Sequence, residues 1–108
     1  MHVDDLNMKV TAAILTAQRC ADGTEEFRDA YRDVAFAEEA LAICTEAGSV
    51  EGEVCRCGAV TAALRARMPY YAHALALKYL AQGLAPGMRV RMEQLRKLAL
   101  DEIGEDDA

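Results

Sequence analysis

Two of the four cysteines, Cys55 and Cys57, stand one residue apart in the stretch EVCRCGAV and are the first candidates for chemistry. Zinc sites commonly use a C-x-x-C pair that a second pair completes. This chain has no second pair, so a metal or redox site here would need Cys44 or His73. If residues 50–67 are helical, positions two apart project about 200° apart around the axis. We therefore interpret both cysteines as packing residues and expect no metal and no cofactor.

The histidine and carboxylate residues give no catalytic pattern. His73 stands four residues before Leu77 on an apolar helical face, without a Ser, Cys or Asp placed to partner a general base. The carboxylates that are adjacent in sequence splay across a helix, which predicts solvated faces and helix N-termini. These pairs are Asp4–Asp5, Glu25–Glu26 and Glu38–Glu39. The chain also has no phosphate-binding glycine-rich loop, H-E-x-x-H or nucleophile elbow. We predict that the protein is not an enzyme.

The composition and the apolar periodicity predict an all-α fold of about five helices. Strong helix formers dominate the 108 residues, and Trp is absent. Residues 1–103 are expected to form a single domain, with 104–108 as an acidic flexible tail. Short connections suit a compact bundle or stacked helical hairpins. The predicted helices cover residues 4–20, 24–47, 50–68, 69–82 and 86–103.

The second predicted helix carries two apolar stripes, so we expect it to contact two neighbours. One stripe is Phe27, Tyr31, Val34, Leu41 and Cys44, and the other is Phe36, Ala40, Ile43 and Ala47.

The third predicted helix carries one stripe of mostly larger side chains and one of small side chains. The larger stripe is Val50, Val54, Cys57, Thr61, Leu64 and Met68. The small stripe is Gly52, Cys55, Ala59, Ala62 and Ala66. Small residues let two helices approach closely, or they leave a groove that a helix of a partner fills.

Charge is strongly segregated along the chain. Residues 1–54 carry 12 acidic and 4 basic side chains, and residues 55–100 carry one acidic and eight basic side chains. Three interpretations remain open: pairing with the acidic half or tail, an acidic protein partner, or nucleic acid. The basic residues are Arg56, Arg65, Arg67, Lys78, Arg89, Arg91, Arg96 and Lys97.

The stretch YYAHALALKYLAQGLAP, residues 70–86, resembles the second helix of a tetratricopeptide repeat. The matching residues are Tyr71, Ala74, Ala81 and Pro86. Lys78 departs from the pattern, because the motif has an aromatic residue there. Residues 36–43 and 70–77 also align at an offset of 34, the repeat period of that family. The resemblance covers about half of the chain, residues 55–99.

The resemblance implies a concave helical surface that binds a peptide or helix of a partner, as in small bacterial secretion chaperones and adaptors. We therefore predict a non-catalytic protein-binding module. Aromatic and arginine side chains are over-represented at the energetic centres of interfaces. The expected contact residues are Arg65, Arg67, Tyr70, Tyr71, His73, Arg89 and Arg91.

Two other functions remain open from the sequence: a nucleic-acid-associated regulatory factor that uses residues 55–100, and a homo-oligomeric structural protein. The first residues do not read as a signal peptide, and no apolar run is long enough to cross a membrane. The cysteine spacing favours reduced thiols. These features predict a cytoplasmic protein without a membrane partner.

Overall fold

The computed structural model describes residues 3–106 and confirms an all-α fold. Five helices follow one another with short connections, and no strand is present in this part of the chain. The helices are α1 (Val3–Gln18), α2 (Glu25–Ile43), α3 (Val50–Arg65), α4 (Pro69–Leu80) and α5 (Pro86–Asp106).

Three helices begin where their capping residues predict. The hydroxyls of Thr24 and Ser49 each accept a hydrogen bond from the backbone N–H three residues on, at 3.1 and 3.0 Å. These bonds satisfy N–H groups that have no partner within the helix. Pro69 occupies the first turn of α4, where its missing N–H has no cost.

The C-terminal ends of all five helices differ from the predicted ones by two to four residues, and the differences in α2 and α5 affect the interpretation. α2 ends at Ile43 rather than Ala47, and the Arg56 guanidinium takes up the carbonyls of Ala42 and Thr45 at this end. α5 runs on to Asp106, so residues 104–106 are helical rather than the start of a tail, and they extend away from Lys97 along the helix axis instead of folding back over it. Residues 107 and 108 lie outside the described part of the chain.

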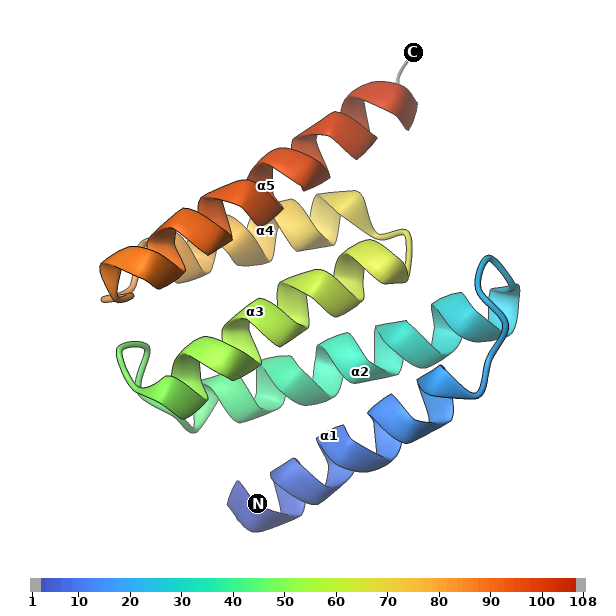
Figure 1. Ribbon diagram of the computed structural model, residues 1–108, viewed down its shortest axis with the longest axis horizontal. Helices are drawn as coiled ribbons and strands as arrows, with labels where there is room; N and C mark the ends of the chain where they lie inside the picture. The colour runs from blue at the N-terminus through green and yellow to red at the C-terminus, as the bar shows by residue number, and fades with distance from the viewer. Residues whose placement is uncertain (1–2, 107–108) are drawn as a thin grey trace.

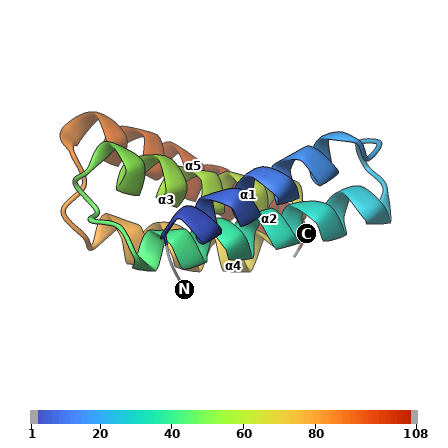
Figure 2. The ribbon, with the colours of Figure 1, turned by 90° about the horizontal axis from the view of Figure 1, so that it is seen from below.

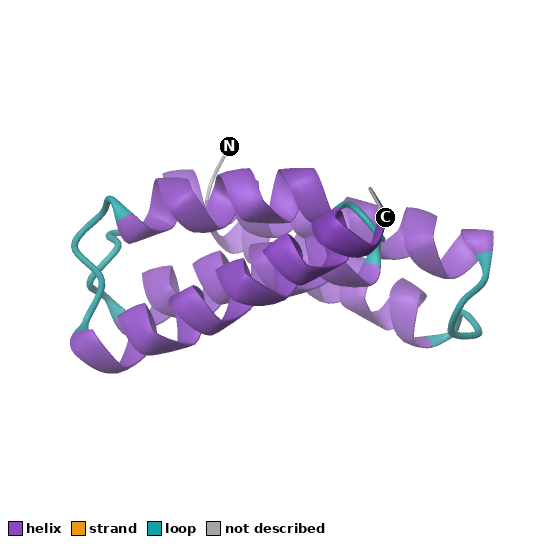
Figure 3. Ribbon diagram, turned by 90° about the horizontal axis from the view of Figure 1, so that it is seen from above, coloured by secondary structure: helices purple, strands orange, loops and turns teal. Residues whose placement is uncertain are grey.

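The helices form two layers, with α1, α3 and α5 in one and α2 and α4 in the other (Figures 1 and 2). The smallest dimension, 19 Å, corresponds to two helices of about 10 Å stacked on one another. Each helix packs on the next, and the connecting loops lie at the ends of the helices (Figure 3). α3 also packs on α5, whereas no Cα atoms of the described α1 and α3 come within 8 Å of each other.

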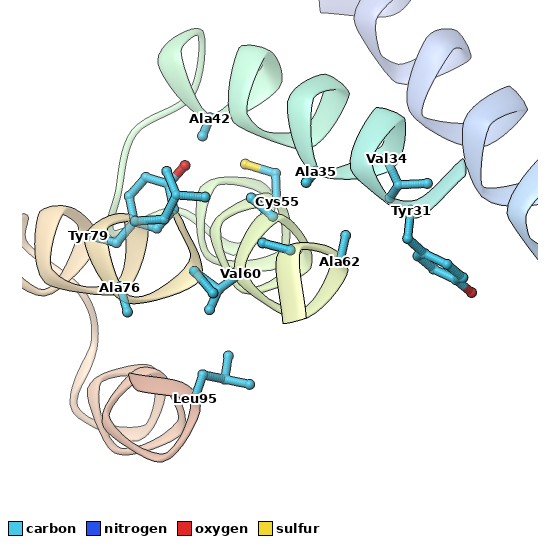
Figure 4. Close-up of a cluster of buried hydrophobic side chains, with 14 of the residues drawn as sticks. Tyr31, Val34, Ala35, Ala42, Cys55, Val60, Ala62, Ala76, Tyr79 and Leu95 are labelled. Carbon is cyan, nitrogen blue, oxygen red and sulfur yellow. The ribbon is translucent and has the colours of Figure 1, made fainter. Parts of the chain in front are cut away.

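The small stripe of α3 lies in the core. Cys55, Ala59 and Ala62 are almost fully buried. Cys55 and Ala62 lie on the side of α3 that faces α2, near Ala35 (Figure 4). Of the two uses that the sequence left open, close packing is therefore the one observed. Small side chains let α2, α3 and α4 approach, while Tyr79 and Leu95 supply volume around them.

The prediction that α2 contacts two neighbours is confirmed, since it packs on α1 and α3. Several residues predicted to face the core are nevertheless exposed. Phe36 and Ile43 of α2 leave 46% and 76% of their surface open, and Cys44 is exposed as well. Val50 and Val54 of α3 are 78% and 61% exposed. Among the described residues, no helix is long and apolar enough to span a bilayer.

Candidate functional site

A groove runs between α1 and α3 and has α2 as its floor. It consists of two adjoining hollows of about 260 Å³ each, which share Glu38 of α2. None of the α1 residues that line it forms a hydrogen bond to α3. The lining residues of α1 are Asn7, Val10, Thr11, Ile14 and Gln18, spaced along one helical face. The walls of α3 include Val50, Val54, Cys57, Gly58, Thr61 and Arg65. We call this feature the α1–α3 groove.

Glu38 lies on the floor of the groove and is only 7% exposed, so its predicted place on a solvated face is wrong. Its carboxylate lies against α3 where Gly58 has no side chain, because a Cβ at residue 58 would come 2.8 Å from it. A glycine inside a helix lowers helix stability by up to about 1 kcal/mol relative to alanine. Gly58 therefore provides the space that this carboxylate occupies.

The Glu38 carboxylate has an unusual electrostatic environment. Among the described residues, none donates a hydrogen bond to it and none forms an ion pair with it. Burial raises the pKa of Glu38 to about 7, and no opposing interaction lowers it. A buried carboxylate with a strongly raised pKa in a cleft marks a candidate functional site.

Two of the predicted contact residues, Arg65 and Arg91, meet at one end of the groove. Arg65 lies over the Tyr31 ring at 5.2 Å from the ring centroid and donates a hydrogen bond to the Tyr31 hydroxyl at 3.2 Å. Arg91 reaches the same hollow from α5. Neither arginine pairs with a described carboxylate. Glu51 lines the opposite end, so the groove has one acidic and one basic end.

Arg56 of the basic segment lies in the core rather than on the surface. It is 5% exposed, and its guanidinium donates five hydrogen bonds, two of them to carbonyls at the end of α2. The guanidinium also lies 5.6 Å from the centroid of the Tyr79 ring. It is therefore unavailable to a partner and serves to fasten α2, α3 and the end of α4 together.

The other predicted contact residues are dispersed. Arg67 has a left-handed φ of 60° and lines another hollow near Asp22, which Arg65 also lines. Tyr71 bridges α4 and α2, since its ring packs edge-on against Phe36 at 5.7 Å and its hydroxyl donates to the Glu39 carboxylate. The Nε2 atom of His73 is buried without a partner among the described residues. Tyr70 and Arg89 are exposed, and Arg89 donates to the Leu80 carbonyl.

Cys55 and Cys57 face different neighbours, as the helical spacing predicts. The Cys55 thiol lies 3.4 Å from the Thr45 hydroxyl, on the α2 side of α3. The Cys57 thiol contacts the sulfur of Met88 in α5. Burial raises the pKa of both thiols, so both stay protonated at neutral pH.

Sequence reasoning missed Glu38, Gly58 and the α1 wall of the groove. One signal for Glu38 was present: it occupies a vacant step in the apolar stripe of α2, four residues after Val34 and three before Leu41. The α1 wall had no such signal, because the gap depends on how α1 and α3 sit on α2.

The groove has apolar, small and uncharged polar side chains on its walls, one buried carboxylate on its floor and two arginines at one end.

In comparisons with known proteins, the chain matches no family model, no curated protein and no solved structure.

Proposed function

We propose that the protein is a non-catalytic adaptor or chaperone of the cytoplasm that holds a peptide segment of another protein in the α1–α3 groove. The observation that carries this proposal is the open groove between two helices that lie in the same layer without touching. Val50 and Val54 expose apolar surface along it, which a bound segment would remove from water.

The dimensions of the groove suit a short segment. The α1 residues that line it run from Asn7 to Gln18, which corresponds to about 17 Å of helix. A partner helix of about eleven residues, or an extended segment of about five, has this length. The tetratricopeptide resemblance supports the same proposal, since it implies a concave helical surface that binds a peptide or helix of a partner.

The basic segment supports a protein partner better than nucleic acid. Arg56 is buried and Arg65 and Arg91 point to the groove, so the eight basic side chains do not form one surface. Arg89, Arg96 and Lys97 share an open face of α5, and Glu93 pairs with Arg96 there. Phosphate binding draws its affinity from clustered cations. We therefore keep the nucleic-acid function as the second candidate.

A displayed library of random peptides of about twelve residues tests the proposal. Selection on the wild-type protein should enrich peptides that bind Val54→Arg at least about tenfold more weakly, because the long side chain fills the groove. Val90→Arg is the matched control: Val90 is 60% exposed, against 61% for Val54, and lies on α5 outside the groove. This variant should bind like the wild type.

Failure to enrich any peptide, or enriched peptides that bind Val54→Arg as well as the wild type, would overturn the proposal. Sedimentation of the free protein adds a further arm. A dimer that Val54→Arg dissociates would show that the groove holds a second copy of this chain instead of a different protein.

A further inference from the structure

The floor of the α1–α3 groove presents a buried charge that no described residue neutralises. Glu38 keeps only 7% of its surface exposed, and it lines both hollows of the groove. Two other charged side chains are nearly buried: Arg56 forms five hydrogen bonds, whereas one carboxylate oxygen of Glu53 has no partner among the described residues. Buried charges are normally paired or hydrogen-bonded, so an unpartnered one points to a missing partner.

We propose that the α1–α3 groove selects a peptide segment that carries a lysine or arginine among apolar residues, and that this cation pairs with the Glu38 carboxylate. The proposal rests on the peptide-binding function proposed above and adds the chemistry of the segment. Val54 and Ile14 line the walls on the two sides of the floor, so apolar side chains should flank the cation.

The charges along the groove also give the segment a direction. Glu51 stands at one end, Glu38 in the middle, and Arg65 and Arg91 at the other end. Arg65 is already held by Tyr31, so its guanidinium is fixed before the partner arrives. An acidic residue should therefore lie on one side of the cation and none on the other, since like charges face each other at a cost.

The position of Glu38 makes its pairing energetically favourable. Folding has already removed most of the Glu38 side chain from water, so a binding partner has less of it left to desolvate. Because Gly58 has no side chain, the Glu38 carboxylate lies next to the backbone of α3, and no side chain at residue 58 covers its oxygens. A cation that reaches Glu38 therefore gains an ion pair in a low-dielectric site, where such pairs are strongest.

The displayed library gives the first test. Peptides enriched on the wild-type protein should share one lysine or arginine, with an acidic residue on one side only. Selection on Glu38→Gln, which keeps the size of the side chain, should still enrich groove-binding peptides but without the shared cation. Groove-binding peptides with no basic preference on the wild type would overturn this inference and leave the proposed function standing, whereas no enrichment at all would overturn the function.

A synthetic pair of peptides gives the second test. The enriched peptide should bind the wild type at least about tenfold more tightly than its analogue with norleucine in place of the cation. That ratio should fall to about one on Glu38→Gln and stay unchanged on Glu39→Gln, a matched control at the next residue. An unchanged ratio on Glu38→Gln would also overturn the inference.

The affinity of the cationic peptide should rise as the pH increases through neutrality, because only the ionised carboxylate attracts the cation. The charged or titratable groups that face this region are Tyr31 of α2, Glu51, Cys55, Cys57 and Arg65 of α3, Tyr79 of α4 and Arg91 of α5, and the α1 wall has none. Arginine stays charged, and burial raises the pKa of both thiols and of Tyr79, so Glu38 is the group that titrates here near pH 7. Pairing with the cation should lower the pKa of Glu38. A pH dependence that persists in Glu38→Gln would contradict this assignment.

Discussion

The two gaps in the α1, α3 and α5 layer have opposite outcomes: α3 and α5 touch across α4, whereas α1 and α3 do not touch across α2. Positions 34 residues apart show why. The face of α5 that packs inward has Met88, Met92 and Leu95, and Met92 and Leu95 are at most 2% exposed. The corresponding face of α3 has Val54, Gly58 and Thr61, which line the groove.

The floor helices differ at the corresponding position as well. α4 has the fully buried Ala72, and 34 residues before it α2 has Glu38. A small floor residue with large residues above it gives a closed contact. A long carboxylate with a glycine beside it gives an open one. The groove therefore arises because a few side chains of α2 and α3 differ from those at the corresponding positions of α4 and α5, and not because the helices are arranged differently.

Two of the buried charges differ in a similar way: Arg56 forms five hydrogen bonds in the core, while Glu38 on the open side has none from the described residues. Glu53 of α3 is a third buried charge, lies outside the groove lining, and has one carboxylate oxygen without a partner among the described residues. A buried charge with all its hydrogen bonds stabilises the fold, because removing it leaves its buried partners without a hydrogen bond. An unsatisfied one destabilises the fold, which a role in binding would explain.

The largest effect is expected at Arg56. Arg56→Met should lower the free energy of unfolding by about 4 kcal/mol, because five hydrogen bonds in the core are lost and the Thr45 carbonyl is left without its donor. Urea denaturation followed by circular dichroism measures this change. Arg89→Met is the control, since Arg89 is exposed and donates to a single carbonyl, and it should change stability by less than about 1 kcal/mol. Equal effects at both arginines would refute the central role of Arg56.

The next largest effect should separate the closed gap from the open one. Met92→Ala removes a fully buried side chain and should lower stability by about 3 kcal/mol through lost burial and the cavity left behind. Val54→Ala on the groove face should change it by less than about 0.5 kcal/mol, since Val54 is already 61% exposed. A comparable loss at Val54 would mean that the groove is closed in solution.

Glu38→Gln should change stability in the opposite direction. Folding raises the pKa of Glu38 from 4.5 to about 7, so the folded protein holds this proton more tightly than the unfolded chain. Stability contributed by this group is therefore full below about pH 4.5, falls as the pH rises and is lost above about pH 7. The variant should match the wild type near pH 4 and be about 2 kcal/mol more stable near pH 8, after allowance for solvent screening. Parallel pH profiles of the two proteins, from thermal or urea unfolding, would contradict a buried, unpaired carboxylate.

The sequence was sufficient for the helices and insufficient for the groove. Ser49 and Pro69 mark helix starts through local backbone effects, so these starts can be predicted without tertiary information. The end of α2 cannot be predicted in this way, because its carbonyls accept hydrogen bonds from Arg56, which is more than ten residues away. The sequence predicts the two stripes of α3, but their periodicity does not indicate which stripe packs against another helix. The charge of Glu38 suggested solvent, and only the packing of α1 and α3 on α2 shows that it is buried.

The smallest effect, at Gly58, tests whether this glycine exists to accommodate Glu38. Gly58→Ala alone should lower stability by about 1 kcal/mol, because the added Cβ would come 2.8 Å from the Glu38 carboxylate and must displace it. In a Glu38→Ala background the obstacle is gone, and the higher helix propensity of alanine should make the same change stabilising by about 0.5 kcal/mol. The sign should therefore reverse between the two backgrounds, a coupling of about 1.5 kcal/mol in a double-mutant cycle. Gly104→Ala in α5, where an added Cβ meets nothing within 4 Å, should have the same effect in both backgrounds. Additive effects at residues 38 and 58 would separate the glycine from the carboxylate and assign the open gap to another cause.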